Sequence, residues 1–325
     1  MNFYKLKAVI TEIYGSIDTL KLSDEPIPSL KHGEVLINVK ACSINPIDWK
    51  ILKGNLKILF GKKPPKILGS DFCGKIVKIG ENSNYKIGDE VWGLLQIRNL
   101  GKNHGTNAEY IVCDEKIIDY KPKNLTFEES ASFPLACLTS FQALIHQAKI
   151  KKKQNILING CSGGVGIFAI QIAKYYDCTI TGICSEKNRI FSKQLGCDNI
   201  IDYQKEDILK NDNNYDIWFD VIGNYSFPLI KHQLSSKGFY INSMPTREAL
   251  INTSWHSLFN IFRNKKAQVV MVKPSKKDLL EIRSLVEKNI LKTKVDKIYK
   301  LNEYVDAYKY SQSQRAQGKL VIKVS

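Results

Sequence analysis

The stretch from Ile156 to Lys174, ILINGCSGGVGIFAIQIAK, limits what this chain can fold into more than any other part of the sequence. It opens with a short apolar run, which is typical of a buried parallel strand. A glycine-rich turn follows, and apolar residues recur after the turn at helical spacing. A strand, a glycine-rich turn and a helix in this order predict a unit that binds a dinucleotide. Glycine lets the backbone approach a pyrophosphate, and the N-terminus of the helix offers it unpaired N–H groups.

The glycine turn departs from the strict G-x-G-x-x-G pattern at one position. The pattern covers Cys161 to Gly166, and Cys161 replaces the first glycine. An ordinary tight turn between a strand and a helix would explain such an incomplete pattern on its own. A second apolar segment, Cys178 to Cys184, follows the helix at the distance expected for the next strand of a nucleotide-binding domain. This context favours nucleotide binding.

The end of that second segment predicts which nicotinamide dinucleotide binds. An Asp or Glu at this point would bond the ribose 2′-hydroxyl of NAD. Ser185 stands there instead, with Lys187, Asn188 and Arg189 close behind it, and a hydroxyl beside cations suits a 2′-phosphate. We therefore expect NADPH to contact Ser185, Lys187 and Asn188. Two alternatives stay open. Glu186 would become the NAD-type acid if the turn shifted by one residue, and the whole cluster would also serve as a solvated helix start.

Length and composition set the broad class. At 325 residues the chain is long enough for two domains, each with its own core. Hydrophobic residues make up 43% and charged residues 25%, and no apolar run reaches the ~20 residues that span a bilayer. The net charge of +16 raises the question of nucleic acid, but the lysines are scattered in short clusters. We expect no membrane or nucleic-acid partner, whereas anionic cofactors and substrates suit the charge.

The cysteines and histidines show no pattern of disulfide or metal binding. None of the eight cysteines forms a C-x-x-C pair, and the five histidines are isolated. The first residues of the chain carry no signal-peptide pattern. We therefore expect free, buried thiols in a protein of the reducing cytoplasm.

The chain reads as a β-rich part followed by an alternating part. Turn residues separate strand candidates in residues 1–124, which predicts a closed or partly closed barrel. From Thr126, a predicted N-cap, helices and strands alternate up to Pro274, which predicts a doubly wound parallel sheet. The final strand needs a sheet to join, so we expect it to return to the first domain. The expected domains are 1–124 with 274–325, and 125–273.

The individual elements are expected as follows. The early strands are Lys7–Ile13, Glu34–Ala41, Gly74–Ile79, Glu90–Leu94 and Glu109–Cys113. The later strands are Asn199–Tyr203, Tyr215–Val221, Gly238–Asn242, Gln268–Val272 and Lys319–Val324. The helices, besides that of the glycine turn and the one after Thr126, are Thr139–Ala148, Arg189–Leu195 and Lys276–Lys288.

Further motifs over nearly the whole chain resemble the medium-chain dehydrogenase/reductase superfamily and, within it, the zinc-free quinone oxidoreductase branch. They are ILGSDFCGKIVKIG (67–80), NYKIGDEVWG (84–93), FPLACLTSFQAL (133–144), the glycine turn, CSEKN (184–188), LGCDNIIDY (195–203) and GKLVIKV (318–324). The segments ACSINPIDWKILKG (41–54) and VVMVKP (269–274) are similar to those of enone, alkenal and quinone reductases. The resemblance implies an α/β protein with a GroES-like β-barrel catalytic domain and a Rossmann-type domain that binds NADPH.

The same resemblance separates this chain from the zinc alcohol dehydrogenases. Those enzymes carry a Cys ligand where this chain has Asn45, and Gly-His-Glu where it has Gly69-Ser70-Asp71. The four clustered cysteines of their structural zinc lobe are also missing from the sequence. Because Asn and Ser do not replace thiolate and imidazole as zinc ligands, we expect no metal.

By resemblance, Asn45 lies near the nicotinamide carboxamide or the substrate carbonyl, and Thr139 contacts the nicotinamide side. The other residues assigned to NADPH are Ser162, Gly164 and Val165 at the pyrophosphate with Gly163 in the same turn, Tyr203 at the 2′-phosphate, Ile222 and Gly223 at the nicotinamide ribose, and Lys319 near the cleft. Structural alternatives stay open for four of these. Asn45 would cap a turn, Thr139 would cap a helix, Tyr203 would pack at a strand end and Lys319 would be solvated.

The implied reaction is direct hydride transfer from NADPH to a quinone or to the β-carbon of an α,β-unsaturated carbonyl, without zinc. Asn45 and Thr139 are the candidate catalytic residues, with Asn45 as a hydrogen-bond donor to the developing enolate. No residue stands out in the sequence as a general acid. Two other functions stay open: an NADPH-binding protein with little catalysis, as zeta-crystallins are in lens, and an enoyl-thioester reductase. The habit of the branch favours a homodimer over a monomer.

Overall fold

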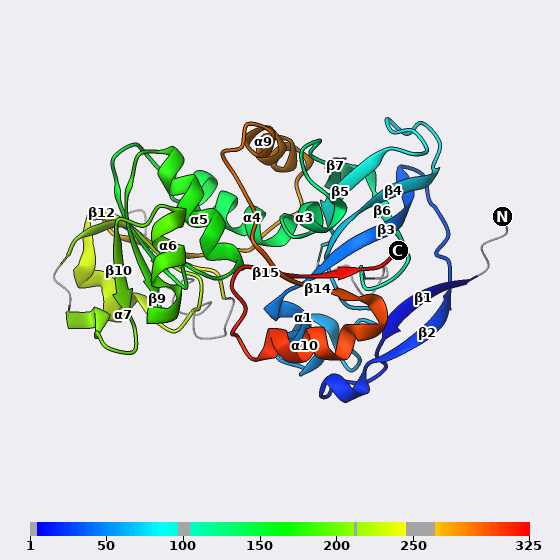
Figure 1. Cartoon of the computed structure of the whole chain (residues 1–325), viewed down its shortest axis with the longest axis horizontal. Coiled ribbons are helices and arrows are strands. Elements are labelled where there is room, and N and C mark those ends of the chain that lie inside the picture. Colours follow the sequence, from blue (N-terminus) through cyan, green and yellow to red (C-terminus); the bar gives the residue numbers. More distant parts are fainter. Residues whose placement is uncertain (1–4, 97–104, 211–212, 245–263) are drawn as a thin grey trace. The chain divides into compact units, whose positions relative to one another are not determined.

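The computed structural model describes residues 5–96, 105–210, 213–244 and 264–325, and the chain divides into two compact units (Figure 1). The first comprises Met1–Leu135, Lys273–Asn289 and Thr293–Ser325, and the second comprises Ala136–Val272 and Ile290–Lys292. The first boundary follows Leu135 rather than residue 124. The reason is that helix α3 (Phe127–Ala131) packs on strands of the first unit.

A seven-stranded sheet forms the framework of the first unit. Its strands run in the order β14-β15-β3-β4-β5-β7, and β6 also pairs with β3. A separate antiparallel pair joins β1 (Lys5–Ile10) to β2 (Lys21–Pro26). The last strand pairs antiparallel with β3, which confirms that the end of the chain returns to the first unit. The bounds are β3 Glu34–Ile44, β4 Asp71–Ile79, β5 Glu90–Leu94, β6 Tyr110–Asp114, β7 Ile118–Tyr120, β14 Val295–Lys300 and β15 Lys319–Lys323.

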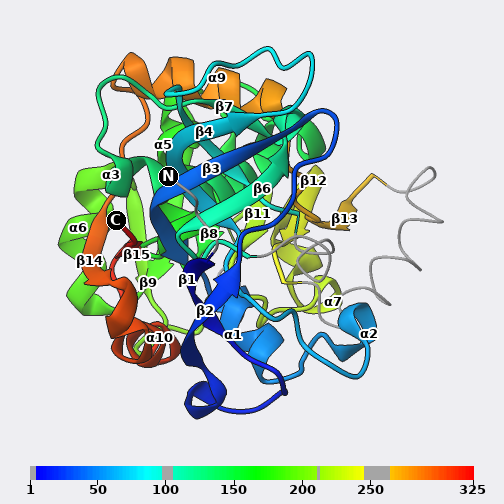
Figure 2. The ribbon, with the colours of Figure 1, turned by 90° about the vertical axis from the view of Figure 1, so that its right-hand side faces the viewer.

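Helices of the first unit pack on this sheet and on one another. Trp49 of α1 (Pro46–Leu52) donates from Nε1 to Ser311 Oγ of α10 (Tyr304–Gln312) at 3.2 Å. Helix α9 (Lys276–Glu287) lies against β7 (Figure 2), where Arg283 and Asp119 form an ion pair at 2.9 Å. A short helix α2 (Lys57–Phe60) follows α1. As predicted, Thr126 caps α3, since its Oγ1 accepts the Glu129 N–H at 3.1 Å.

The second unit confirms the doubly wound parallel sheet. Its six strands run in the order β10-β9-β8-β11-β12-β13, and every neighbouring pair is parallel. The helices of this part of the chain include α5 (Gly164–Tyr175), α6 (Arg189–Leu195) and α7 (Phe227–Ile230). The strand bounds are β8 Asn155–Asn159, β9 Thr179–Cys184, β10 Asn199–Asp202, β11 Tyr215–Asp220, β12 Leu234–Asn242 and β13 Lys266–Val269.

The expected helix Thr139–Ala148 is wrong in its extent. Helix α4 already begins at Pro134 and ends at Phe141, and a π-helical segment, Gln142–Gln147, continues it. Proline is well tolerated in a first helical turn because its missing N–H would have no partner there. The residues of α4 are buried on all sides, so no amphipathic period marks its beginning in the sequence.

All eight cysteines are free and buried, as expected. Burial raises the pKa of the Cys42, Cys73 and Cys113 thiols, so these three are protonated at neutral pH. Among the residues that the structure describes, no helix combines the length and the apolar character needed to cross a membrane.

Candidate functional site

The glycine turn joins β8 to α5 within the second unit. Gly160 has a φ of 80°, which favours glycine, and the N–H groups of Gly160 and Cys161 donate to the Ile183 carbonyl at 3.1 and 3.2 Å. These two bonds tie the turn to the end of β9. Gly163 is the N-cap of α5, and no capping side chain satisfies the first N–H groups of the helix.

Strand register brings the ends of four neighbouring strands to one edge of this sheet. Asn159, the last residue of β8, is level with Ile183 of β9 and with Asp220 of β11. On the outer side of β9, Cys184 is level with Asp202 of β10. The segments that follow these residues therefore lie at the same carboxyl edge. The strand order reverses at β8, and open α/β sheets bind ligands at such a switch point.

The glycine turn has the shape that a pyrophosphate needs. A Cβ on Gly163 would meet only the Gly160 carbonyl oxygen within 4 Å, at 3.5 Å. A Cβ on Gly166 would instead lie 2.6 Å from backbone atoms of Cys161, so α5 packs directly on the turn. An open glycine at a helix N-terminus fits the phosphates of a dinucleotide. The turn and the start of α5 contain the predicted residues Ser162, Gly163, Gly164 and Val165.

The predicted residues at the end of β9 contact the glycine turn. Asn188 Nδ2 donates to Ser162 Oγ at 3.0 Å and to Ser185 Oγ at 3.5 Å. Ser162 and Ser185 are both buried. The structure thus joins three residues that the sequence assigns to the phosphates of the cofactor.

Cations surround Glu186, the residue that argued for NAD. Arg189 Nε lies 2.8 Å and Lys205 Nζ 3.3 Å from its carboxylate. Hydrogen bonds from these two side chains lower the pKa of Glu186. Its carboxylate is therefore ionised, and the two cations balance its negative charge. Lys187 is exposed beside it. Tyr203 is 58% exposed just after β10, so its alternative role as a packed strand-end aromatic is wrong.

The loop after β11 carries the residues assigned to the nicotinamide ribose. Gly223 donates its N–H to Asp220 Oδ1 at 2.8 Å, and the same oxygen accepts Asn159 Nδ2 at 2.7 Å. Ile222, the residue before Gly223, is 52% exposed in this loop, which these hydrogen bonds hold in place. Thr139 is buried in the second half of α4 and not at its N-terminus, so helix capping does not explain it.

The first unit holds a second group of predicted residues, buried where three strands begin or end. Asn45 follows β3, Asp71 begins β4 and Lys319 begins β15. Their exposed fractions are 4%, 0% and 4%, so the reading of Lys319 as a solvated lysine is wrong. Lys319 Nζ donates to Asn45 Oδ1 at 2.5 Å and lies 3.3 Å from Asp71 Oδ2. Asn45 Nδ2 donates to the same Asp71 oxygen at 2.9 Å.

Asn45 also has the structural role that was left open for it. It is the N-cap of α1 before Pro46, and its backbone N–H donates to Asp48 Oδ2 at 2.8 Å. Burial raises the pKa of Asp48 to about 7, and the negative charge of Asp71 adds to the rise. The backbone of Asn45 thus serves the helix, while its side chain belongs to the cluster with Lys319 and Asp71.

Sequence reasoning did not select Asp71 as a site residue. A signal was available, because a carboxylate stands inside the apolar segment ILGSDFC. Its partners become visible only through strand register, which sets Asp71 opposite Ser43 and Leu320 opposite Ile44. Ser43 Oγ indeed donates to Asp71 Oδ2.

Within the described ranges, no group of three or more His, Cys, Asp or Glu side chains could hold a metal ion. The amide of Asn45 is bound by Lys319 and Asp71, and the neighbouring Ser70 is buried. Freedom from zinc stays a prediction.

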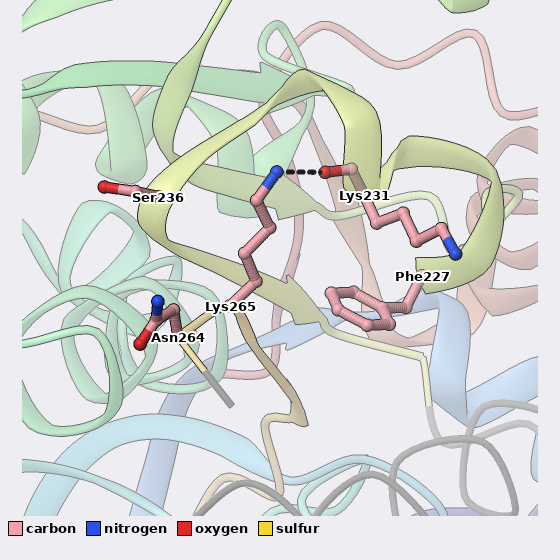
Figure 3. A pocket seen from close by; sticks show the side chains of 5 residues that line it. All are labelled: Phe227, Lys231, Ser236, Asn264 and Lys265. Carbon is pink, nitrogen blue, oxygen red and sulfur yellow. Dashed lines mark hydrogen bonds between the residues drawn. The ribbon is translucent and has the colours of Figure 1, made fainter. Parts of the chain in front are cut away.

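A pocket of about 440 Å³ lies elsewhere in the second unit (Figure 3), where Lys265 Nζ donates to the Lys231 carbonyl at 2.8 Å. Ser236 near the start of β12 and Lys265 just before β13 line it. Amino ends of parallel strands lie opposite the carboxyl edge, so this pocket is separate from the glycine turn.

Known proteins resemble this chain over two thirds of its length or more. Residues 31–123 match the family described as alcohol dehydrogenase GroES-like domain, and residues 195–322 match zinc-binding dehydrogenase. The quinone-oxidoreductase homolog of Spinacia oleracea is 32% identical over 318 residues, which is 95% of each protein. The NADPH-dependent alkenal/one oxidoreductase of Arabidopsis thaliana is 36% identical over 225 residues, 67% of this chain and 58% of that protein. The quinone oxidoreductase structure from Coxiella burnetii covers 99% of this chain and 100% of its own, at 30% identity and a TM-score of 0.89.

A GroES-like unit in one chain with a nucleotide-binding parallel sheet defines an oxidoreductase that depends on a nicotinamide dinucleotide. The chain belongs to the medium-chain dehydrogenase/reductase superfamily, in its quinone and enone reductase branch.

Proposed function

We propose that this protein uses NADPH to reduce quinones or α,β-unsaturated carbonyl compounds, without a metal ion. The observation that carries the proposal is the carboxyl edge of the parallel sheet. There the glycine turn, Ser185, Tyr203 and the Ile222–Gly223 loop follow four adjacent strands in register. The names of the two similar proteins, a quinone-oxidoreductase homolog and an alkenal/one oxidoreductase, support this choice of acceptor.

The residues of the second unit would bind and orient the dinucleotide. The first N–H groups of α5 would hold the pyrophosphate, because no side chain caps them. Ile222 and Gly223 would border the nicotinamide ribose, and Thr139 the nicotinamide. Bound NADPH would supply a hydride to an electrophilic carbon.

The charges at the end of β9 support NADPH over NADH. Arg189 and Lys205 already converge on the Glu186 carboxylate, and Lys187 is exposed beside them. A 2′-phosphate offers more negative charge and more acceptor oxygens than one carboxylate. It would therefore compete with Glu186 for the same cations, while Ser185 would offer its hydroxyl.

The cluster of the first unit would serve the acceptor. Hydride addition places negative charge on the carbonyl or quinone oxygen, and fixed donors stabilise such charge more than mobile water does. Lys319 is such a donor, and Asn45 and Asp71 hold it rigidly in a buried network. No metal ion is needed for this task if a cation is already present.

An NADPH-oxidation screen across quinones, 2-alkenals and enoyl-CoA thioesters tests the proposal. We expect turnover with quinones or small 2-alkenals. Turnover with enoyl thioesters alone would replace the proposal with an enoyl-thioester reductase. NADPH binding without turnover of any acceptor would replace it with a binding protein. As a control, Gly163→Leu should fill the open side of the turn, so it should abolish both NADPH binding and turnover.

A further inference from the structure

Strand register explains why Lys319 lies where it does. Leu320 is opposite Ile44 in the antiparallel pair of β15 and β3, so the preceding residue is level with Asn45. Gly318 has a φ of 95°, and the Lys319 N–H donates to the Lys294 carbonyl at 2.8 Å. The backbone on both sides of the lysine is therefore held in place, and its side chain enters the buried cluster.

Counting donors and acceptors in this cluster leaves one N–H donor of Lys319 without an acceptor among the described residues. An ammonium group has three N–H donors, and an Asn amide has two. Both amide donors of Asn45 are directed inward, to Asp71 Oδ2 at 2.9 Å and to Ser43 Oγ at 3.5 Å. Lys319 uses two donors, on Asn45 Oδ1 and on Asp71 Oδ2. Among the described residues, the structure shows no acceptor for its third N–H.

Stability alone gives little reason for such a pair. Burying two charges costs desolvation energy, and apolar side chains of similar volume often stabilise a fold as well or better. The second oxygen of Asp71 accepts the Leu135 N–H at 2.6 Å, so this carboxylate is fixed from two sides. The network orients the ammonium group firmly, which is what a catalytic donor requires.

We propose that Lys319 is the catalytic acid of this protein, and that Asn45 and Asp71 position it. This inference rests on the proposed reductase function. Its third N–H would first bond the acceptor oxygen on which negative charge grows. The N–H bond then breaks, its electron pair stays on Nζ, and the proton forms an O–H bond of the enol or hydroquinone. Water returns a proton to Nζ before the next turnover.

Three variants test this acid. Lys319→Met removes the donor and the proton, so kcat with a 2-alkenal should fall by about 10²–10⁴. Lys319→Arg keeps a cation and its donors, but guanidinium does not release a proton in proteins. Its kcat should therefore stay at least tenfold below that of the wild type. Lys323→Met is the matched control on the same strand, because the Lys323 side chain is 58% exposed, and its kcat should not change.

A double variant distinguishes the loss of catalysis from the loss of the folded structure. Lys319→Met alone leaves Asp71 buried without its cation, which is destabilising. Lys319→Met combined with Asp71→Asn removes both charges. This double variant should melt near the wild-type temperature, bind NADPH within twofold of wild type and still show the low kcat.

Binding of para-nitrophenolate provides a readout besides activity. This anion resembles the oxyanion that hydride addition forms before the proton is transferred, and an absorbance titration measures its dissociation constant. Lys319→Met should weaken binding by about 10–100-fold, as expected when a hydrogen bond to a charged group is lost. Lys323→Met should leave the dissociation constant unchanged.

The outcomes separate this inference from the proposed function. Wild-type turnover that survives in the double variant would overturn the role of Lys319 and leave the reductase intact. Recovery of kcat to within twofold in Lys319→Arg would also overturn the acid, because it would show that charge alone suffices. Equal phenolate affinity of wild type and Lys319→Met would show that the third N–H of Lys319 does not bind an oxyanion. A wild type that reduces no acceptor would instead remove the proposed function.

Discussion

Replacing Gly166 with alanine measures how closely α5 packs on the glycine turn. A Cβ at this position would lie 2.6 Å from the C and Cα atoms of Cys161 and closer still to the Gly160 carbonyl oxygen. In proteins, a Cβ atom essentially never comes within 3.0 Å of a heavy atom beyond its own residue, its two chain neighbours and the backbone of its own helix. These neighbours are backbone atoms, so they cannot rotate away. The helix must therefore move away from the strand that it covers.

The expected loss follows from two opposing effects. Forcing a methyl group into a closely packed site costs about 1–3 kcal/mol, and contact with backbone belongs at the upper end. Alanine is a better helix former than glycine by at most about 1 kcal/mol, which offsets part of the cost. The variant should lose about 2 kcal/mol of unfolding free energy. For a domain of this size that lowers the melting temperature by about 4–8 °C.

Gly163→Ala is the matched control, three residues earlier in the same turn. Its Cβ would meet only the Gly160 carbonyl oxygen at 3.5 Å, and its φ of −83° suits any residue. Alanine is a poorer N-cap than glycine but also restricts the unfolded chain, so the two effects nearly cancel. This variant should melt near the wild-type temperature. Its methyl group nevertheless points into the proposed pyrophosphate site, so NADPH should bind more weakly.

Thermal melts and NADPH titrations of both variants separate packing from binding. Gly166→Ala should lose stability, and Gly163→Ala should lose affinity while it keeps stability. If Gly166→Ala melted at or above the temperature of Gly163→Ala, the close contact of α5 with the turn would be refuted.

Four further measurements test the site. Elemental analysis should find well under one zinc per chain, since Asn45 and Ser70 stand where zinc ligands would be; stoichiometric zinc whose removal stops turnover would contradict this. NADPH should bind at least about tenfold more tightly than NADH, because hydrogen bonds to a charged group are worth roughly 1.5–3 kcal/mol; equal dissociation constants would return Glu186 to the NAD role. Asn45→Ala removes the side chain that holds Lys319 in place, so it should lower kcat by about 10²–10³ and leave NADPH affinity unchanged; a lower melting temperature with unchanged kcat would remove Asn45 from the site. Burial raises the pKa of Asp48 from 3.8 to about 7, so folding takes up a proton between these values and the unfolding free energy should fall as pH rises through them. Urea melts of Asp48→Asn should show a flatter fall, and an unchanged slope would show that Asp48 does not titrate in this range.

Elements with local signals at their ends were predicted closely from the sequence. Strand Glu90–Leu94 and helix Arg189–Leu195 have the expected bounds, and Thr126 caps its helix. Burial on both faces removes such signals. Strand β3 runs on to Ile44, beyond the expected Ala41, because its last residues are all buried and no longer alternate. Exposure can hide an element too: in β14 (Val295–Lys300) only Tyr299 is buried, and this strand was not predicted.

The two halves of the candidate site differ in how far sequence alone could lead. In the nucleotide-binding half, every predicted residue except Thr139 lies in a segment that follows a strand, and parallel strands in Rossmann order bring those strand ends together. The other half depends on long-range pairing. Asn45 and Lys319 are 274 residues apart and meet through antiparallel register, and Asp71 joins them from a third strand. Chain order alone does not contain that register.

The buried cysteines bear on how this protein would withstand the substrates proposed for it. Quinones and enones are soft electrophiles that alkylate thiolates, and a thiolate must be both ionised and accessible to react. All eight thiols of this chain are buried, and burial raises the pKa of Cys42, Cys73 and Cys113, so neither condition is met at these three. Burial at these three positions would therefore make the protein chemically compatible with the proposed acceptors, which alkylate accessible thiolates. Eight cysteines and resistance to electrophiles can coexist because packing, rather than composition, decides the reactivity of a thiol.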